Sequence, residues 1–222
     1  MTAFGLDYVG WINAMPPGTV TILSDVSWEM YEKLLRALDE RPGIRLTYDS
    51  GRLQVMTLSI NHERPAGLFP HLIMALAIEC GMNFISIRSA TLRKQSEVKG
   101  TEPDDCYYFT DYKRMGKRTT IDLAIDPPPD LAFEVDITNP SLNKFPIYAA
   151  IGVPELWRYT IQGVYFYRLE ADEYIEFDRS NLFPFLGPDD VFSFLSIGDA
   201  EGAVGMVAEF REWIKTNKEK QQ

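Results

Sequence analysis

Residues 127–159 have the sequence PPPDLAFEVDITNPSLNKFPIYAAIGVPELWRY, and this stretch decides the fold class of the chain. Residues 130–137 form an almost continuous apolar run between prolines, which is typical of a strand buried in the centre of a sheet. Residues 141–152 predict a short helix with Ser141 as its N-cap. A buried strand that is followed by a helix and by another strand-like run indicates an α/β or α+β fold.

Three strand-like segments rich in aromatic residues follow, at 155–160, 164–170 and 173–178. Turn signals at Gln162-Gly163 and Ala171-Asp172 separate these segments, so the sequence predicts an antiparallel aromatic meander. Alternating aromatic side chains usually pack within a sheet, although their outer face could equally form a dimer interface.

The residues upstream add further elements. A first helix is expected within 24–40, capped by Ser24 or Ser27, and a hairpin is expected at 44–58 around Asp49-Ser50-Gly51. The remaining elements are expected as a helix at 62–81, strands at 83–90 and 104–109, an amphipathic helix at 199–215 and a flexible tail at 216–222. The order predicts a mixed sheet flanked by helices, in a single domain of residues 1–222.

The chain has 222 residues, and its Lys+Arg 22 against Asp+Glu 32 give a formal net charge of -10. This excess of acidic residues repels phosphate groups, which excludes a protein that coats nucleic acid indiscriminately with its whole surface. A local basic patch remains compatible with the sequence. Its candidate members lie between residues 88 and 118: Arg88, Arg93, Lys94, Lys99, Lys113, Arg114, Lys117 and Arg118.

Several classes of site and location are excluded by residue types that are rare or absent. Cys80 and Cys106 form no CxxC pair, so neither a disulfide framework nor a cysteine zinc site is indicated. His62 and His71 are the only histidines, and no HExxH, Walker loop, GxGxxG or GxSxG motif occurs. No stretch approaches the roughly 18 apolar residues of a membrane span. The sequence therefore predicts a cytoplasmic protein without a membrane segment.

Two acidic residues stand inside the predicted central strand. Glu134 and Asp136 are two residues apart, so their side chains share one face, while Phe133 and Val135 take the other. Two like charges on one face favour a cation, and oxygen ligands select hard cations such as Mg²⁺ or Mn²⁺. Alternatively, these acids lie at the end of the sheet and are solvated or paired with arginine. Repulsion between unpaired acids predicts that Glu134→Gln leaves the melting temperature unchanged or raises it.

Three strings together carry a family resemblance: NHER at 61–64, GTEPDDCYYF at 100–109 and the stretch at 127–159. They resemble the Uma-two type family of restriction endonucleases, which is expanded in cyanobacteria and belongs to the PD-(D/E)xK nuclease superfamily. The resemblance extends from about the first helix to the aromatic meander. It implies a restriction-endonuclease-like core, to which the meander is added.

The resemblance implies a role for four residues in turn. Asp104, in the Pro103-Asp104 pair, is similar to the first acid of the signature and would be a metal ligand. Glu134 is similar to the second acid, and the backbone carbonyl of Val135 would face the metal. Glu63 matches a helical glutamate that many superfamily members add to the site, although a carboxylate at a helix N-terminus is also explained by the helix dipole alone.

The sequence departs from the signature at two positions. Asp136 stands where the signature expects lysine, and the resemblance implies that Lys144, four residues before Tyr148, is the substitute. Lys144 would orient the attacking water and stabilise the charge of the transition state. Asn143 stands where relatives often have aspartate.

The activity implied by this resemblance is hydrolysis of nucleic-acid phosphodiester bonds by an endonuclease that depends on Mg²⁺ (or Mn²⁺). The expected substrate is DNA, and the expected assembly is a homodimer, because cleavage of a duplex needs two sites. The departures at Asp136 and Asn143, together with the net charge of -10, leave an alternative open. In that alternative, the chain keeps the nuclease fold as a catalytically inactive binding or assembly module.

Overall fold

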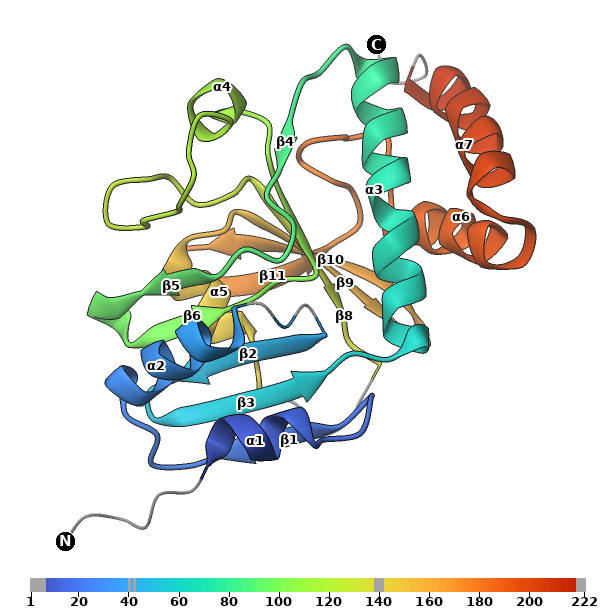
Figure 1. Ribbon diagram of the computed structural model, residues 1–222. Coiled ribbons are helices and arrows are strands. Elements are labelled where there is room, and N and C mark those ends of the chain that lie inside the picture. The colour runs from blue at the N-terminus through green and yellow to red at the C-terminus, as the bar shows by residue number, and fades with distance from the viewer. Residues whose placement is uncertain (1–6, 40, 42, 138–141, 219–222) are drawn as a thin grey trace, which may run out of the picture.

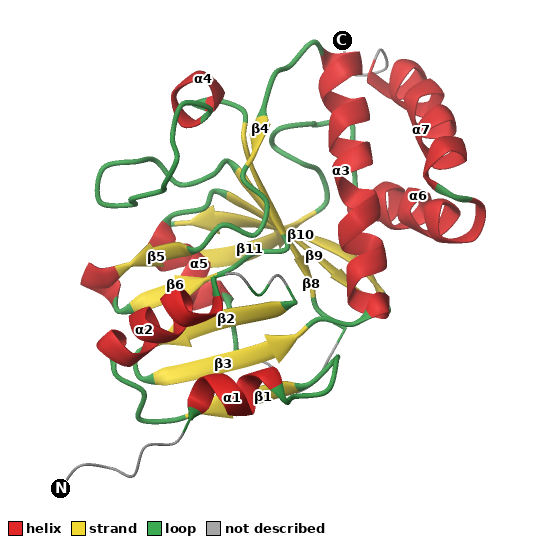
Figure 2. Cartoon of the chain, viewed as in Figure 1, coloured by secondary structure: helices red, strands yellow, loops and turns green. Residues whose placement is uncertain are grey.

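The computed structural model describes residues 7–39, 41, 43–137 and 142–218, which form two β-sheets flanked by seven α-helices (Figure 1 and Figure 2). The α+β class expected from the sequence is confirmed. The strands divide into a five-stranded and a six-stranded sheet, whereas the sequence predicted one mixed sheet.

The five-stranded sheet is antiparallel throughout, with the order β1-β3-β2-β6-β5. Its strands are β1 (Val20–Leu23), β2 (Ile44–Asp49), β3 (Arg52–Thr57), β5 (Leu92–Lys94) and β6 (Lys99–Thr101), with the 3-10 helix η1 (Gln95–Glu97) before β6. The core on one face lies under α1 (Tyr8–Asn13) and α2 (Trp28–Leu38). The side chains of β2 and β3 alternate, so the polar Thr47 and Gln54 point away from this core.

The six-stranded sheet has the order β11-β10-β9-β8-β7-β4. Its strands are β4 (Ile85–Ser86), β7 (Asp105–Tyr108), β8 (Leu131–Val135), β9 (Glu155–Thr160), β10 (Gly163–Glu170) and β11 (Glu173–Phe177). Only the β8 and β9 pair is parallel among these described strands, and the other pairs are antiparallel. Strand β8 therefore has neighbours on both sides, as its apolar sequence predicted.

Helices cover both faces of the six-stranded sheet. Figure 1 shows α3 (Ile60–Cys80), α6 (Pro188–Glu201) and α7 (Ala203–Lys218) gathered on one side, where they bury Phe133 and Val135 in the largest core cluster. The short α5 (Phe145–Ile151) packs against the opposite face with Ala132. Helix α4 (Tyr112–Met115) lies in the long connection between β7 and β8. Glu134, which alternates with Phe133 and Val135, consequently faces the α5 side.

Two local predictions are confirmed by backbone details. Ser27 is the N-cap of α2, since its hydroxyl oxygen accepts a hydrogen bond from the Met30 N–H at 3.2 Å. The β2–β3 hairpin turns at Ser50 and Gly51, whose φ angles are 47° and 94°. Two successive positive φ angles fit the tight turn that matches the twist of paired strands.

The predicted helix at 141–152 begins later than expected. Helix α5 starts at Phe145, with Lys144 at the N-cap position, and Ser141 lies outside the described residues. Pro146 accounts for this start, because a proline fits the first turn of a helix but removes a hydrogen bond further inside.

The C-terminal region also differs from the prediction of one helix at 199–215. Gly202, with a φ of 94°, separates α6 from α7, and α7 continues to Lys218. The ammonium group of Lys218 donates to the Glu79 carbonyl oxygen at 2.5 Å. Residues 216–218, expected in a flexible tail, are therefore helical, whereas 219–222 lie outside the described residues.

Helices that combine the length and apolar character needed to cross a membrane are absent from the described part of the chain.

Candidate active site

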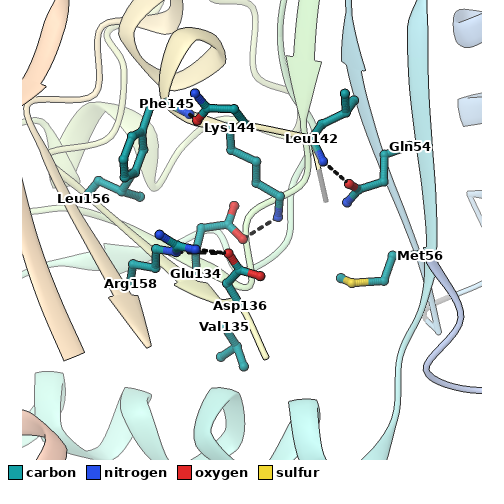
Figure 3. A pocket seen from close by; sticks show the side chains of 11 residues that line it. Gln54, Met56, Glu134, Val135, Asp136, Leu142, Lys144, Phe145, Leu156 and Arg158 are labelled. Atoms are coloured by element: carbon teal, nitrogen blue, oxygen red, sulfur yellow. Dashed lines mark hydrogen bonds and ion pairs between the residues drawn. The ribbon is translucent and has the colours of Figure 1, made fainter. Parts of the chain in front are cut away.

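A cavity of about 260 Å³ opens between the polar face of the five-stranded sheet and the carboxyl end of β8 (Figure 3). Strand β3 contributes Gln54 to one wall, and β8 contributes Glu134 to the facing wall. Asp136, which follows β8, and Lys144, at the start of α5, complete a ring of polar groups. Side chains from segments far apart in the sequence thus converge on one hollow.

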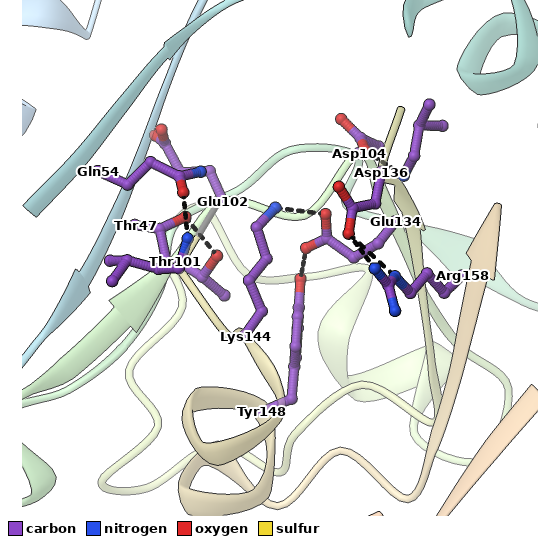
Figure 4. A network of polar contacts seen from close by, with 12 residues as sticks. Thr47, Gln54, Thr101, Glu102, Asp104, Glu134, Asp136, Lys144, Tyr148 and Arg158 are labelled. Carbon is purple, nitrogen blue, oxygen red and sulfur yellow. Dashed lines mark hydrogen bonds and ion pairs between the residues drawn. The ribbon is translucent and has the colours of Figure 1, made fainter. Parts of the chain in front are cut away.

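Glu134 is the most deeply placed acid of the cavity, with 4% of its surface exposed. Its Oε2 accepts a hydrogen bond from Lys144 Nζ at 2.5 Å, and its Oε1 accepts one from the Tyr148 hydroxyl (Figure 4). Burial raises the pKa of Glu134, and the nearby Asp104 charge adds to this effect, whereas Lys144 opposes it. Lys144 and Tyr148 belong to one helix start and lie four residues apart, so both reach the same carboxylate.

Lys144 remains a cation in this setting. Burial alone would lower the pKa of Lys144, but the carboxylates of Glu134 and Asp104 outweigh it and raise that pKa. Burial also raises the pKa of Tyr148, so its hydroxyl stays protonated and donates to Glu134. The site therefore holds an ammonium group and a buried acid in direct contact.

Asp104 lies beside this pair, immediately before β7. Its backbone N–H donates to the Phe133 carbonyl oxygen at 3.2 Å, and its Oδ2 accepts from the Val135 N–H at 2.7 Å. The Oδ2 atom is also 3.3 Å from His62 Nε2. Burial would raise the pKa of Asp104, but His62, Lys144 and the Val135 N–H together lower it. Asp104 is accordingly an ionised, buried carboxylate.

Asp136, at the position of the expected signature lysine, pairs with an arginine. Arg158 lies opposite Glu134 in the parallel β8–β9 register and donates from Nε to Asp136 Oδ2 at 3.0 Å, with a second contact from its terminal NH2 group. The Arg158 guanidinium also lies 6.0 Å from the centre of the Phe145 ring. The sequence left open whether Asp136 binds a cation, is solvated or pairs with arginine. In the structure, Asp136 pairs with arginine.

His62, rather than Glu63, is the helix α3 residue that points at Asp104. The His62 side chain is 3% exposed, whereas the Glu63 side chain is 56% exposed and approaches His62 Nδ1 at 3.6 Å. The buried residues of α3 repeat from His62 to Pro65, Ala66 and Phe69 at helical spacing. This periodicity could have identified His62 from the sequence as the residue on the inner face.

The fit of this site to a divalent cation depends on its oxygen and nitrogen donors. Among the described residues, no three His, Cys, Asp or Glu side chains stand together as a preformed metal cage. Asp104 and Glu134 are nevertheless close enough for each charge to affect the other. Neither ring nitrogen of the buried His62 makes a hydrogen bond within the described chain, although Asp104 Oδ2 lies within ion-pair distance of Nε2, at 3.3 Å. A buried nitrogen without a hydrogen bond, beside carboxylates, fits a bound cation.

Gln54 fixes the segment that leads into Lys144. Its Oε1 accepts a hydrogen bond from the buried Leu142 N–H at 2.6 Å, across 88 residues of sequence. A leucine at this position would leave that N–H unpaired. We expect Gln54→Leu to lower the free energy of unfolding by about 1–3 kcal/mol, measured by urea denaturation.

The matched control for this substitution is Gln162→Leu, at an exposed turn, which should change the free energy of unfolding by less than about 0.5 kcal/mol. Equal stability of Gln54→Leu and wild type would show that the contact does not hold the segment.

The basic residues between 88 and 118 do not form the free patch that the sequence allowed. Six of the eight have acidic partners within 4.0 Å. These pairs are Arg88–Asp105, Arg93–Glu32, Lys94–Glu97, Lys99–Asp49, Arg114–Asp126 and Arg118–Asp126. Their charges are largely balanced within the protein, so this segment adds little long-range attraction for phosphate.

A solved structure supports the fold. A crystal structure from Anabaena variabilis, described as "a putative nuclease belonging to DUF820", has a TM-score of 0.50 and 18% sequence identity to this chain. The similarity covers 68% of this chain and 90% of that chain. No curated protein sequence matches.

The sequence also matches a family model over residues 28–195, which includes Asp104, Glu134 and Lys144. The model is that of Uma2, described as "Putative restriction endonuclease". The matched region extends from α2 to within α6 and so contains most strands of both sheets. The chain belongs to the Uma2 family.

Proposed function

We propose that this chain is an endonuclease that hydrolyses phosphodiester bonds of nucleic acid with the help of a divalent cation, Mg²⁺ or Mn²⁺. Family membership and the fold of the Anabaena protein support the nuclease class. DNA is the proposed substrate, and a homodimer is the proposed assembly, because cutting both strands of a duplex needs two sites. The described cysteines are free, which suits a reducing compartment such as the cytoplasm.

The observation that carries this proposal is the contact between Lys144 and Glu134. The signature lysine is absent from β8, yet an ammonium group from the start of α5 lies 2.5 Å from the second acid of the signature. A buried acid and a lysine at the mouth of a cavity form a site in which ionisable groups have shifted pKa values. Such groups in a cleft are candidates for catalysis.

Each proposed residue has a distinct task. Asp104 and Glu134 would hold the cation, close to the backbone of Val135. The cation, when bound, would polarise a phosphate oxygen and favour deprotonation of a water molecule. Lys144 would orient the attacking water and offset the negative charge that develops on the phosphate. Glu63 would act indirectly, because its exposed side chain approaches the ring of His62.

An inactive binding or assembly module is the second candidate, and one observation favours it. Both oxygens of Glu134 already have partners within the chain, Lys144 and Tyr148. A site whose buried acid is satisfied by its own side chains is stable without a cation. The pairing of most basic residues between 88 and 118 with acids also favours the inactive module, because it leaves little free positive charge to attract phosphate.

The experiment that separates the two candidates is a cleavage assay on plasmid DNA, single-stranded DNA and RNA, with Mg²⁺, Mn²⁺ or EDTA. We expect cation-dependent nicking of DNA by the wild type and its loss in Glu134→Gln. The control is Glu155→Gln, because Glu155 is an equally buried acid of the same sheet that bonds Trp157 outside the cavity. Absence of cleavage from every wild-type reaction would favour the inactive module, whereas cleavage that survives Glu134→Gln would refute the role of Glu134.

A further inference from the structure

His62 is a buried histidine whose ring nitrogens make no hydrogen bond within the described residues. Helix α3 places it on the inner face of its first turn, and both ring nitrogens are inaccessible to solvent and lack hydrogen bonds within the described residues. Burying such a group without a partner costs free energy, so native proteins usually supply a partner. The groups nearest to the ring, Asp104 and Glu63, indicate what that partner is.

The position of His62 relative to Asp104 suits two ligands of one cation. Its Nε2 is 3.3 Å from Asp104 Oδ2. Ligands at adjacent corners of an octahedral site, each roughly 2.1 Å from the ion, lie about 3 Å apart. The observed separation is close to this value, and it is long for a direct hydrogen bond.

The other ring nitrogen faces a carboxylate. His62 Nδ1 is 3.6 Å from Glu63 Oε1, on the side of the ring away from Asp104. Histidines that bind metals commonly donate their second N–H to a carboxylate, which fixes the ring and makes the ligating nitrogen more basic. Glu63 is thereby placed to orient the ring of His62.

We infer that His62 is a ligand of the proposed cation site through Nε2, next to Asp104, and that this nitrogen gives the site a preference for Mn²⁺ over Mg²⁺. The inference rests on the proposed function and specifies its metal. Mg²⁺ takes oxygen ligands almost exclusively, whereas imidazole nitrogen favours first-row transition ions. Glu63 is a positioning residue in this arrangement.

Mn²⁺ itself is the probe for this ligand, because a directly bound nitrogen couples to its electron spin. We expect pulsed electron paramagnetic resonance of the full chain with Mn²⁺ to show nitrogen hyperfine coupling. The coupling should vanish in His62→Ala and persist in His71→Ala, since His71 is the only other histidine and is exposed. Titration should show Mn²⁺ affinity falling at least about 10-fold in His62→Ala and about 10-fold in Glu63→Gln.

Histidine labelled with the heavier nitrogen isotope provides a second measurement that needs no substitution at the buried position. In labelled wild-type protein the coupling should change to that of the heavier isotope, even if His62→Ala does not fold. Mn²⁺ that binds and supports cleavage without nitrogen coupling would overturn the inference and leave the proposed function standing. Failure of the wild-type chain to bind either Mn²⁺ or Mg²⁺ would overturn both.

Discussion

Replacing Lys144 by alanine should lower the rate of nucleic-acid cleavage by about 100-fold, which is the scale of losing one electrostatic stabiliser of a transition state. Lys144 is the ammonium group in contact with Glu134, and its charge also acts on Asp104. Asp136 cannot replace it, since Asp136 is an acid that already holds Arg158. Single-turnover rates with saturating Mn²⁺ measure the effect.

Cation binding should not weaken in Lys144→Ala, because the substitution removes a positive charge from beside the proposed ligands. The matched control is Lys94→Ala. Lys94 contacts the other end of α5, where its Nζ donates to the Ala150 carbonyl oxygen at 2.8 Å, and it does not line the cavity. Lys144→Arg should recover part of the rate by restoring a positive charge. Full activity of Lys144→Ala would refute the role of this lysine.

The parts of the fold that the sequence predicts are those with local signals. Strand β9, Glu155–Thr160, coincides with the expected segment. Its side chains alternate, and the strand ends before the turn that Gln162-Gly163 predicts from the sequence. Strands β5 and β6 have three residues each, too few for any periodicity, and the pairing of β6 with β2 joins residues about 50 positions apart. Such pairings are stabilised by contacts that no short window contains.

The site residues that the sequence predicts likewise lie in local motifs, whereas the contacts that it misses depend on how distant segments pair. Asp104, Glu134 and Lys144 were named through the family resemblance; the structure places Glu134 and Lys144 in one cavity and Asp104 near enough for its charge to act on both. Arg158 was missed as a site residue, because its contact with Asp136 depends on the parallel register of β8 and β9, which a sequence pattern does not specify. The sequence analysis chose Glu63 and overlooked its neighbour His62. The helical spacing from His62 to Phe69 places His62, and not Glu63, on the buried face of α3.

The free energy of unfolding should fall by about 3 kcal/mol in Glu134→Gln, measured by urea denaturation, because one partner of a buried ion pair is removed. This expectation reverses the one drawn from the sequence, in which two unpaired acids repelled each other. Glu134 in fact accepts hydrogen bonds from Lys144 and Tyr148, so its neutralisation leaves the Lys144 ammonium in a largely buried position without its main counter-charge.

A double substitution tests whether the unpaired lysine causes this loss. In Glu134→Gln/Lys144→Met, the lysine charge that lost its main partner is removed as well, and most of the lost stability should return, even though cleavage should not. Glu79→Gln is the control, because Glu79 pairs with the half-exposed Arg211 at 2.6 Å and solvent screens that pair, so the loss of stability should be much smaller than in Glu134→Gln. An unchanged stability of Glu134→Gln would mean that solvent reaches Lys144 and replaces its partner. A double variant no more stable than Glu134→Gln would assign the loss to packing around Tyr148 instead of to charge.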